Sequence, residues 1–303
     1  MEASGFLTSP MSFPASATEP RHAPLFSRIA ELLVGGSLEL SPRELHRAAD
    51  VAALLPANTC IYIPSLPGLP LARTLEAVAA IRAAGLDPVP HVSARRILNG
   101  EEFRSFLKDA VKRYGVHRVL LLGGDEPRAK GPFNDSLEIL ESGLLADSGI
   151  REIGVAGYPE GHPRIPATGL WSAFERKLQL AKEQRLGVYV VTQFSFATNR
   201  VVEYCAALAR SAPEVSIYAG IAGPTDPAAL ARYAQRCGVS VSLRALRTLG
   251  TGIARLVTNS DPHEQLIALG RYSLLREPGN LAGVHIYSFG GAVKTAAWMR
   301  ELI

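Results

Sequence analysis

The polar residues that follow short apolar runs in this chain are of the kinds that move protons and hold ligands. They are Glu39, Tyr62, His91, Asp125, Tyr158, His162, Gln193 and Tyr287. Carboxyl and imidazole groups can exchange protons near neutral pH, while amides and phenols can orient a polar ligand. This set is more than packing requires. It predicts a catalytic site if the fold brings these side chains to one mouth.

Glu39 is the first candidate for acid chemistry. It lies between Leu38 and Leu40, and the alternation of a β-strand would turn its side chain away from both leucines, toward the inside of the fold. A buried carboxyl group without a partner is costly and tends to take up a proton. A raised pKa would suit a general acid. The alternative is a buried glutamate that pairs with an Arg or Lys.

Asp125 and His91 each allow two interpretations. Asp125 follows Gly123 and Gly124, which would let the backbone approach a ligand closely. An Asp in this position is also a common turn former or helix cap. His91 follows Pro90, and it is either functional or a core histidine with satisfied hydrogen bonds.

The segment 158–163, Tyr-Pro-Glu-Gly-His-Pro, holds two prolines and a glycine that would fix a loop. Rigid loops on a scaffold often carry binding or catalytic residues. A metal site is the alternative interpretation of Glu39, His91, Asp125 and His162. The chain has no HxH after its first strand and no HExxH, so we expect no metal.

A repeated unit would position these residues: a short apolar run, a turn and a longer amphipathic stretch. Runs this apolar are typical of strands covered on both faces, as in a parallel sheet. Eight such units predict an α/β fold, a (β/α)8 TIM barrel, with its site at the carboxyl ends of the strands. The alternative is an open doubly wound sheet, which the absence of GxGxxG after the first strand disfavours. The expected strands are 36–40, 59–63, 88–92, 118–123, 152–157, 187–192, 215–220 and 283–287.

Helices are expected between these strands. Ser41, Pro42 and Glu44 predict a helix start with a capping box. Gly85 is expected to end a helix. The expected helical stretches are 71–85, 167–185, 226–237 and, with room for more than one helix, 241–280.

Composition bounds the class of protein. The chain has 303 residues, of which 47% are hydrophobic and 20% charged, so it can bury a large core. Its net charge is only +4, without runs of Lys or Arg, which argues against a nucleic-acid binder. Three scattered cysteines, Cys60, Cys205 and Cys237, are typical of reduced thiols in a cytoplasmic protein.

The first 26 residues differ from the rest of the chain. They are rich in Ser, Pro, Thr and Ala and lack the pattern of a signal peptide, and no apolar stretch in the chain is long enough for a membrane span. We interpret 1–26 as a flexible arm, either disordered or packed over a partner subunit, and 27–303 as a single barrel domain.

Several motifs in order along residues 30–300 resemble the methylenetetrahydrofolate reductases. The most specific is Ala156-Gly157-Tyr158-Pro159-Glu160-Gly161-His162-Pro163, which is similar to the family's AxYPExHP loop. The others are Ser37-Leu38-Glu39, Pro90-His91, Gly124-Asp125, Arg176-Lys177, Thr192-Gln193-Phe194 and 285–291 (HIYSFGG). Each motif is weak alone, but their order on the strand ends of a repeated β/α pattern is specific.

The resemblance implies a (β/α)8 barrel that interconverts 5,10-methylenetetrahydrofolate and 5-methyltetrahydrofolate, usually through FAD reduced by NADH or NADPH. It implies that Glu39 is the general acid and that Asp125 contacts the pterin. It also implies that Gln193 binds the pterin and that Tyr287 lies near the flavin and substrate. The positions it implies for the cofactor are Tyr62, His91, Gly124, Tyr158, His162 and Lys177.

Departures from the family pattern fall mostly on the cofactor positions. Gly123 stands where the family usually has an arginine, and Tyr62 where it usually has a threonine. We therefore hypothesise weak or absent FAD binding, with NADH or NADPH exchanging hydride directly with the folate. A bulkier Tyr62 would fill part of the flavin pocket.

Two other functions are compatible with the same fold, since barrels host many chemistries. One is a catalytically silent barrel that binds folate or a nucleotide and serves a partner protein. The other is a metal-dependent hydrolase. The expected partner of the enzyme is a small tetrahydrofolate derivative, with neither nucleic acid nor membrane, and a homo-oligomer is compatible with the sequence.

Overall fold

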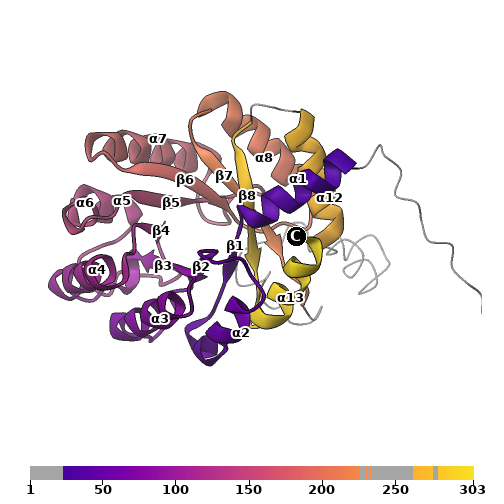
Figure 1. The fold of residues 1–303 in the computed structure, drawn as a ribbon. Coiled ribbons are helices and arrows are strands. Elements are labelled where there is room, and N and C mark those ends of the chain that lie inside the picture. Colours follow the sequence, from indigo (N-terminus) through magenta and orange to yellow (C-terminus); the bar gives the residue numbers. More distant parts are fainter. Residues whose placement is uncertain (1–22, 226–229, 231–232, 234–261, 276–278) are drawn as a thin grey trace, which may run out of the picture.

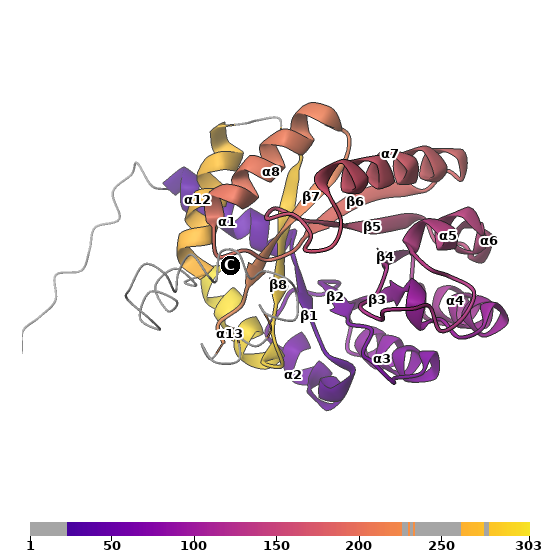
Figure 2. The same cartoon turned by 180° about the vertical axis from the view of Figure 1, so that it is seen from behind.

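The computed structural model describes residues 23–225, 230, 233, 262–275 and 279–303. Within these residues the strands form a closed barrel in the order β1 to β8, each parallel to its neighbours. Figures 1 and 2 show the barrel from opposite sides, with the helices outside it. The predicted (β/α)8 fold is confirmed. The strands are β1 (Ser37–Glu39), β2 (Cys60–Ile63), β3 (Asp87–Ser93), β4 (Arg118–Leu122), β5 (Glu152–Gly157), β6 (Gly187–Thr192), β7 (Ser216–Ala222) and β8 (Leu281–Tyr287).

Helices form the outer layer of the barrel. The helix α1 precedes the first strand and packs on α12 and β8 (Figure 1). The α-helices are α1 (Ala23–Val34), α2 (Ala48–Ala52), α3 (Leu71–Ala83), α4 (Gly100–Tyr114), α5 (Ser136–Glu141), α6 (Leu144–Ser148), α7 (Ala167–Glu183), α8 (Thr198–Ser211), α12 (Pro262–Leu275) and α13 (Ala292–Leu302). Two short 3-10 helices, η1 (Pro42–Arg47) and η2 (Ala94–Arg96), follow β1 and β3.

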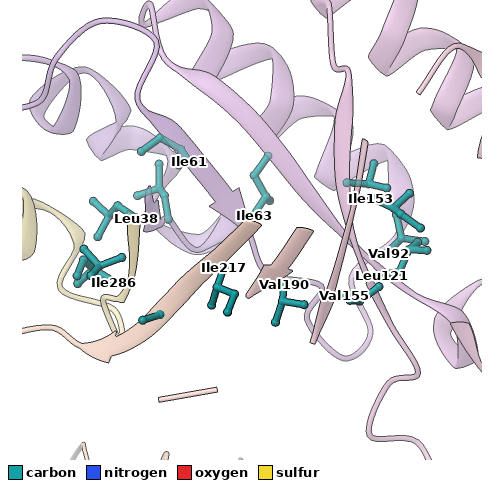
Figure 3. Close-up of a cluster of buried hydrophobic side chains, with 14 of the residues drawn as sticks. Leu38, Ile61, Ile63, Val92, Leu121, Ile153, Val155, Val190, Ile217 and Ile286 are labelled. Atoms are coloured by element: carbon teal, nitrogen blue, oxygen red, sulfur yellow. The ribbon is translucent and has the colours of Figure 1, made fainter. Parts of the chain in front are cut away.

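The main core lies between the outer face of the barrel and these helices. Aliphatic side chains on alternate strand positions fill it, as the apolar runs in the sequence predict. Burying each Leu, Ile or Val side chain stabilises the fold by about 1.5–3 kcal/mol. Figure 3 shows ten of these side chains: Leu38, Ile61, Ile63, Val92, Leu121, Ile153, Val155, Val190, Ile217 and Ile286.

A second, smaller core fills the inside of the barrel. The Tyr62 hydroxyl donates a hydrogen bond to the Tyr189 hydroxyl at 3.1 Å, and Val89, Leu120 and Val191 pack around the pair. Gly154 makes room for Tyr189, because a Cβ atom at this position would lie 2.7 Å from the Tyr189 ring. The inside of the barrel around Tyr62 and Tyr189 is therefore filled by packed side chains.

Two local predictions need correction. The predicted arm lies outside the described residues except for 23–26, which belong to α1 rather than to an arm. Ser41 does cap η1, accepting a hydrogen bond from the Arg43 backbone N–H, but Glu44 does not complete a capping box. Glu44 instead accepts a hydrogen bond from the Ala292 backbone N–H at 3.5 Å, where α13 begins.

Two of the expected helical stretches fall largely outside the described residues. Of 226–237 only Leu230 and Tyr233 are described, and of 241–280 only α12 and the last two residues. The other two expected stretches, 71–85 and 167–185, correspond to α3 and α7.

Candidate functional site

Glu39 ends β1 and turns its side chain into the mouth of the barrel. Leu38 and Leu40, on either side, are fully buried in the outer core, which is the alternation that the sequence predicts. The Glu39 side chain is 15% exposed, so it is shielded but accessible. Among the described residues no Arg or Lys forms an ion pair with it. Within the described residues, Glu39 is therefore not half of a buried salt bridge with an Arg or Lys.

Two histidines bracket the Glu39 carboxyl group. The Nε2 atoms of His91 on β3 and His285 on β8 each lie 3.8 Å from its Oε1 atom. Both Nε2 atoms are buried and have no hydrogen-bond partner among the described residues. A distance of 3.8 Å is too long for a hydrogen bond, so the three groups are close but not locked together.

The electrostatics of this cluster leave His91 uncharged. Burial lowers its pKa to about 4, although the nearby Glu39 carboxylate opposes that shift. At neutral pH the imidazole is neutral, with one nitrogen that accepts a proton and one that donates. The neutral His91 imidazole can therefore accept or donate a hydrogen bond to a ligand that lies beside Glu39.

His285 was not among the candidates predicted from the sequence. Its Nδ1 atom lies 2.8 Å from the Ser37 hydroxyl, and the two residues are register partners where β8 closes on β1. A signal for this residue did exist. Val284 and Ile286 are apolar and face the outer core, so alternation turns the histidine between them inward.

Tyr287 and Gln193 extend the site along the ends of β8 and β6. The Tyr287 hydroxyl donates to the Thr192 carbonyl at 2.9 Å, and its ring packs edge-on against His285 with centroids 4.7 Å apart. Gln193 follows Thr192, and its side-chain Oε1 accepts from the Phe194 backbone N–H at 3.1 Å. Two of the three predicted substrate-binding residues, Gln193 and Tyr287, thus lie at the carboxyl ends of strands, and Tyr287 packs against the Glu39 cluster.

Asp125 lies on the rim of the mouth. Its side chain is 88% exposed and lies 3.6 Å from the Arg96 guanidinium. Burial raises the pKa of Tyr158, and Asp125 adds to that rise. Burial and Arg164 lower the pKa of His162, and Asp125 opposes them. The field of Asp125 therefore reaches both residues.

Tyr158 and His162 belong to one compact loop. Their rings pack edge-on with centroids 5.0 Å apart, and Gly161 between them has a φ of +80°. The predicted residues therefore fall into two groups. His91 and Tyr287 belong to the group around Glu39, and Tyr158 and His162 belong to the group around Asp125.

The remaining predicted cofactor positions are Tyr62, Gly124 and Lys177. The Tyr62 ring packs edge-on against His285, with centroids 4.5 Å apart, and against His91, at 5.9 Å. Tyr62 is only 1% exposed and points into the barrel interior, so in this arrangement it offers no surface to a cofactor. Gly124 has a φ of +93°, which explains the glycine by backbone conformation. Lys177 is half-buried on α7. Burial lowers its pKa, and Asp135, which caps α5, opposes that shift.

The matching family model is described as methylenetetrahydrofolate reductase, and it covers residues 68–254, more than half of the chain. This chain belongs to the methylenetetrahydrofolate reductase family. Methylenetetrahydrofolate reductase 2 of Saccharomyces cerevisiae is 28% identical over 147 residues, which are 45% of this chain. That match spans only 24% of the yeast protein's length.

One solved structure with the same fold is an uncharacterized protein from Clostridium thermocellum, which binds two copies of 5-methyl-5,6,7,8-tetrahydrofolic acid. The TM-score is 0.59 and the sequence identity 10%, with 88% of this chain and 96% of that chain covered. At this identity the likeness concerns the fold alone.

The residues of this family member fit FAD, the family's usual cofactor, poorly. Tyr62 is turned into the barrel and His91 faces Glu39, while Gly123 carries no charge. Among the described residues no group of His, Cys, Asp or Glu is arranged to hold a metal ion. None of the described helices is long and apolar enough to cross a membrane.

Proposed function

We propose that the chain interconverts 5,10-methylenetetrahydrofolate and 5-methyltetrahydrofolate, with hydride exchanged directly with NADH or NADPH. The observation that carries this proposal is the position of Glu39 in a member of this family. Its carboxyl group is shielded in the mouth of the barrel, between two histidines and without a cationic partner among the described residues. A carboxyl group in that setting can deliver a proton in a confined site.

The proposed role of Glu39 is to open the five-membered ring of the substrate. It gives its proton to the ring nitrogen that leaves, and the bond between that nitrogen and the methylene carbon breaks with its electron pair on the nitrogen. The methylene carbon becomes an iminium with the other ring nitrogen. The reduced nicotinamide supplies the hydride that turns this carbon into a methyl group. Glu39 then regains a proton from solvent.

The other residues would bind and orient the folate. Asp125 can accept hydrogen bonds from the pterin, and its negative charge would stabilise the iminium cation. Gln193 can pair with the pterin through its amide. Tyr287 packs on His285 and would limit how the substrate lies above Glu39. Holding the carbon and the hydride donor close in a site without water contributes much of the rate in such transfers.

We propose that no flavin relay takes part. The support is the placement of Tyr62 and His91 and the absence of a charged side chain at residue 123. Tyr158, His162 and Lys177 would then serve the nicotinamide dinucleotide. Their phenol, imidazole and ammonium groups are suited to its polar, negatively charged parts.

The test is an NADH and NADPH oxidation assay with methylenetetrahydrofolate, with and without added FAD. We expect turnover that added FAD does not increase, from purified protein without a flavin absorbance band. A stoichiometric flavin would contradict the direct transfer. If the protein binds folate but shows no turnover with either nucleotide, the proposed enzymatic activity is contradicted and a catalytically silent folate-binding barrel is favoured.

A further inference from the structure

Arg96 connects three loops at the mouth of the barrel. It ends η2, directly after β3, and its side chain is only 13% exposed. Its guanidinium donates to the Ser65 carbonyl in the loop after β2. It also bonds the Glu126 carboxylate at 2.6 Å and lies 3.6 Å from the Asp125 carboxylate, both in the loop after β4. A planar guanidinium with five donors in a fixed fork is suited to make these contacts together.

The neighbouring Arg95 fastens the same loop from the other side. Its backbone N–H donates to the Gly123 carbonyl at 3.1 Å. Its guanidinium donates to the backbone carbonyls of Glu126 at 3.0 Å and Asn134 at 2.8 Å. Arg95 thus binds backbone only, while Arg96 is the one of the two that meets the carboxylates.

Burial of the Glu126 carboxylate strengthens its dependence on Arg96. Its side chain is 11% exposed, and its Oε2 atom is buried with no hydrogen-bond partner in the described part of the chain. Burial alone would raise its pKa, but the hydrogen bond and charge of Arg96 outweigh that and lower it. A buried ionised carboxylate that lost this partner would be left uncompensated, so the loop is strongly held in this form.

Gly124 fits the same arrangement. Its φ of +93° is rarely adopted by other residues, and a Cβ atom there would lie 3.2 Å from the Glu126 Oε2 atom. The conformation of the loop between Gly123 and Glu126 is therefore set by the Arg96 contacts together with this glycine. Asp125 lies between them and projects to the rim.

We propose that Arg96 is a positioning residue for substrate binding: it holds the Asp125 loop in place and supplies the positive charge beside Asp125. Residue 123, a glycine, offers no such charge. The inference rests on the proposed function in one respect, the binding of the pterin by Asp125. The attachment of the loop itself does not depend on any ligand.

The first arm of the test needs no substrate. Hydrogen exchange is measured on peptides covering 123–134 in the wild type, Arg96→Gln, Arg96→Lys and Arg104→Gln. Arg104→Gln is the control. It removes the same charge as Arg96→Gln, but Arg104 pairs only with the exposed Glu101 on α4 among the described residues. We expect exchange in this loop to be at least about tenfold faster in Arg96→Gln, intermediate in Arg96→Lys and unchanged in Arg104→Gln. Unchanged exchange in both Arg96 variants would overturn the proposal.

The second arm measures folate turnover and binding in the same proteins. A misplaced Asp125 should raise KM for the folate by up to about 100-fold, more than it lowers kcat, and Arg96→Lys should recover part of the loss. A mobile loop with unchanged KM and folate affinity would overturn the positioning role. If the wild type neither binds nor converts folate, the proposed function fails, and the exchange data still decide whether Arg96 holds the loop. Arg96→Lys keeps the test valid if Arg96→Gln does not fold.

Discussion

The Ser37 hydroxyl and the Nδ1 atom of His285 lie 2.8 Å apart, although 248 residues separate them in the sequence. This contact fixes the orientation of the His285 ring, and so the nitrogen that faces Glu39. One of the two histidines beside the Glu39 carboxyl group is therefore held in place where β8 closes on β1.

Ser37→Ala should destabilise the protein. The substitution leaves the fully buried His285 without its hydrogen bond at Nδ1, which costs about 1–3 kcal/mol. Urea unfolding measures this free energy. Ser211→Ala, at the exposed end of α8, is the matched control and should change stability by less than about 0.5 kcal/mol. Equal stability of the two variants would mean that the buried contact contributes nothing.

The Glu39→Gln variant should lose turnover but still bind the folate. The amide has nearly the same shape and cannot donate an acidic proton, so kcat should fall by about 100-fold to 10,000-fold while folate affinity changes little. Steady-state oxidation of NADH measures kcat, and a folate titration measures the affinity. Glu31→Gln, on an exposed residue of α1, should behave as wild type. Full activity in Glu39→Gln would show that another group is the acid.

His91 should make stability depend on pH on the acid side. Its pKa is about 4 in the folded protein and about 6.5 when unfolded, so the unfolded chain binds the proton more readily. The contribution of the neutral His91 to the free energy of unfolding is therefore fully present above pH ~6.5. It falls by up to about 3 kcal/mol as the pH drops toward 4. The His91→Asn variant should not show this acid-side loss of unfolding free energy, whereas the variant His46→Asn, at an exposed histidine, should still show it. Unfolding curves across this range decide between them.

Gly154→Ala should be destabilising because the inside of the barrel is full. The added Cβ atom would lie 2.7 Å from the Tyr189 ring and 2.9 Å from Leu120. Such overpacking costs about 1–3 kcal/mol. Gly100→Ala is the control, since its Cβ would meet nothing within 4 Å. The thermal midpoints of both variants test this, and similar midpoints would contradict a tightly filled interior.

The strands were the part of the structure that the sequence predicted best. Short runs rich in Val, Ile and Leu, such as 187–192, can be covered on both faces only in a parallel sheet. Their repetition left few alternatives to a barrel. The inward turn of Glu39 followed from the same alternation, because Leu38 and Leu40 had to face the helices.

The depth of a side chain within the barrel was not predictable in this way. Tyr62 and Glu39 are register partners, yet Tyr62 points into the packed interior while Glu39 lies in the mouth. Alternation says which face a residue takes, but strand tilt and stagger decide which layer it occupies. Arg96 was missed for another reason, because its partners lie in two other loops and no local pattern marks them.

Closure of the barrel between β1 and β8 has a consequence for biosynthesis. His285 is synthesised 248 residues after Ser37, so the two strands that make this contact leave the ribosome at different times. The nascent chain cannot form this contact until β8 has been made. Chains that stop before β8 should therefore lack both the closed barrel and the contact that holds His285.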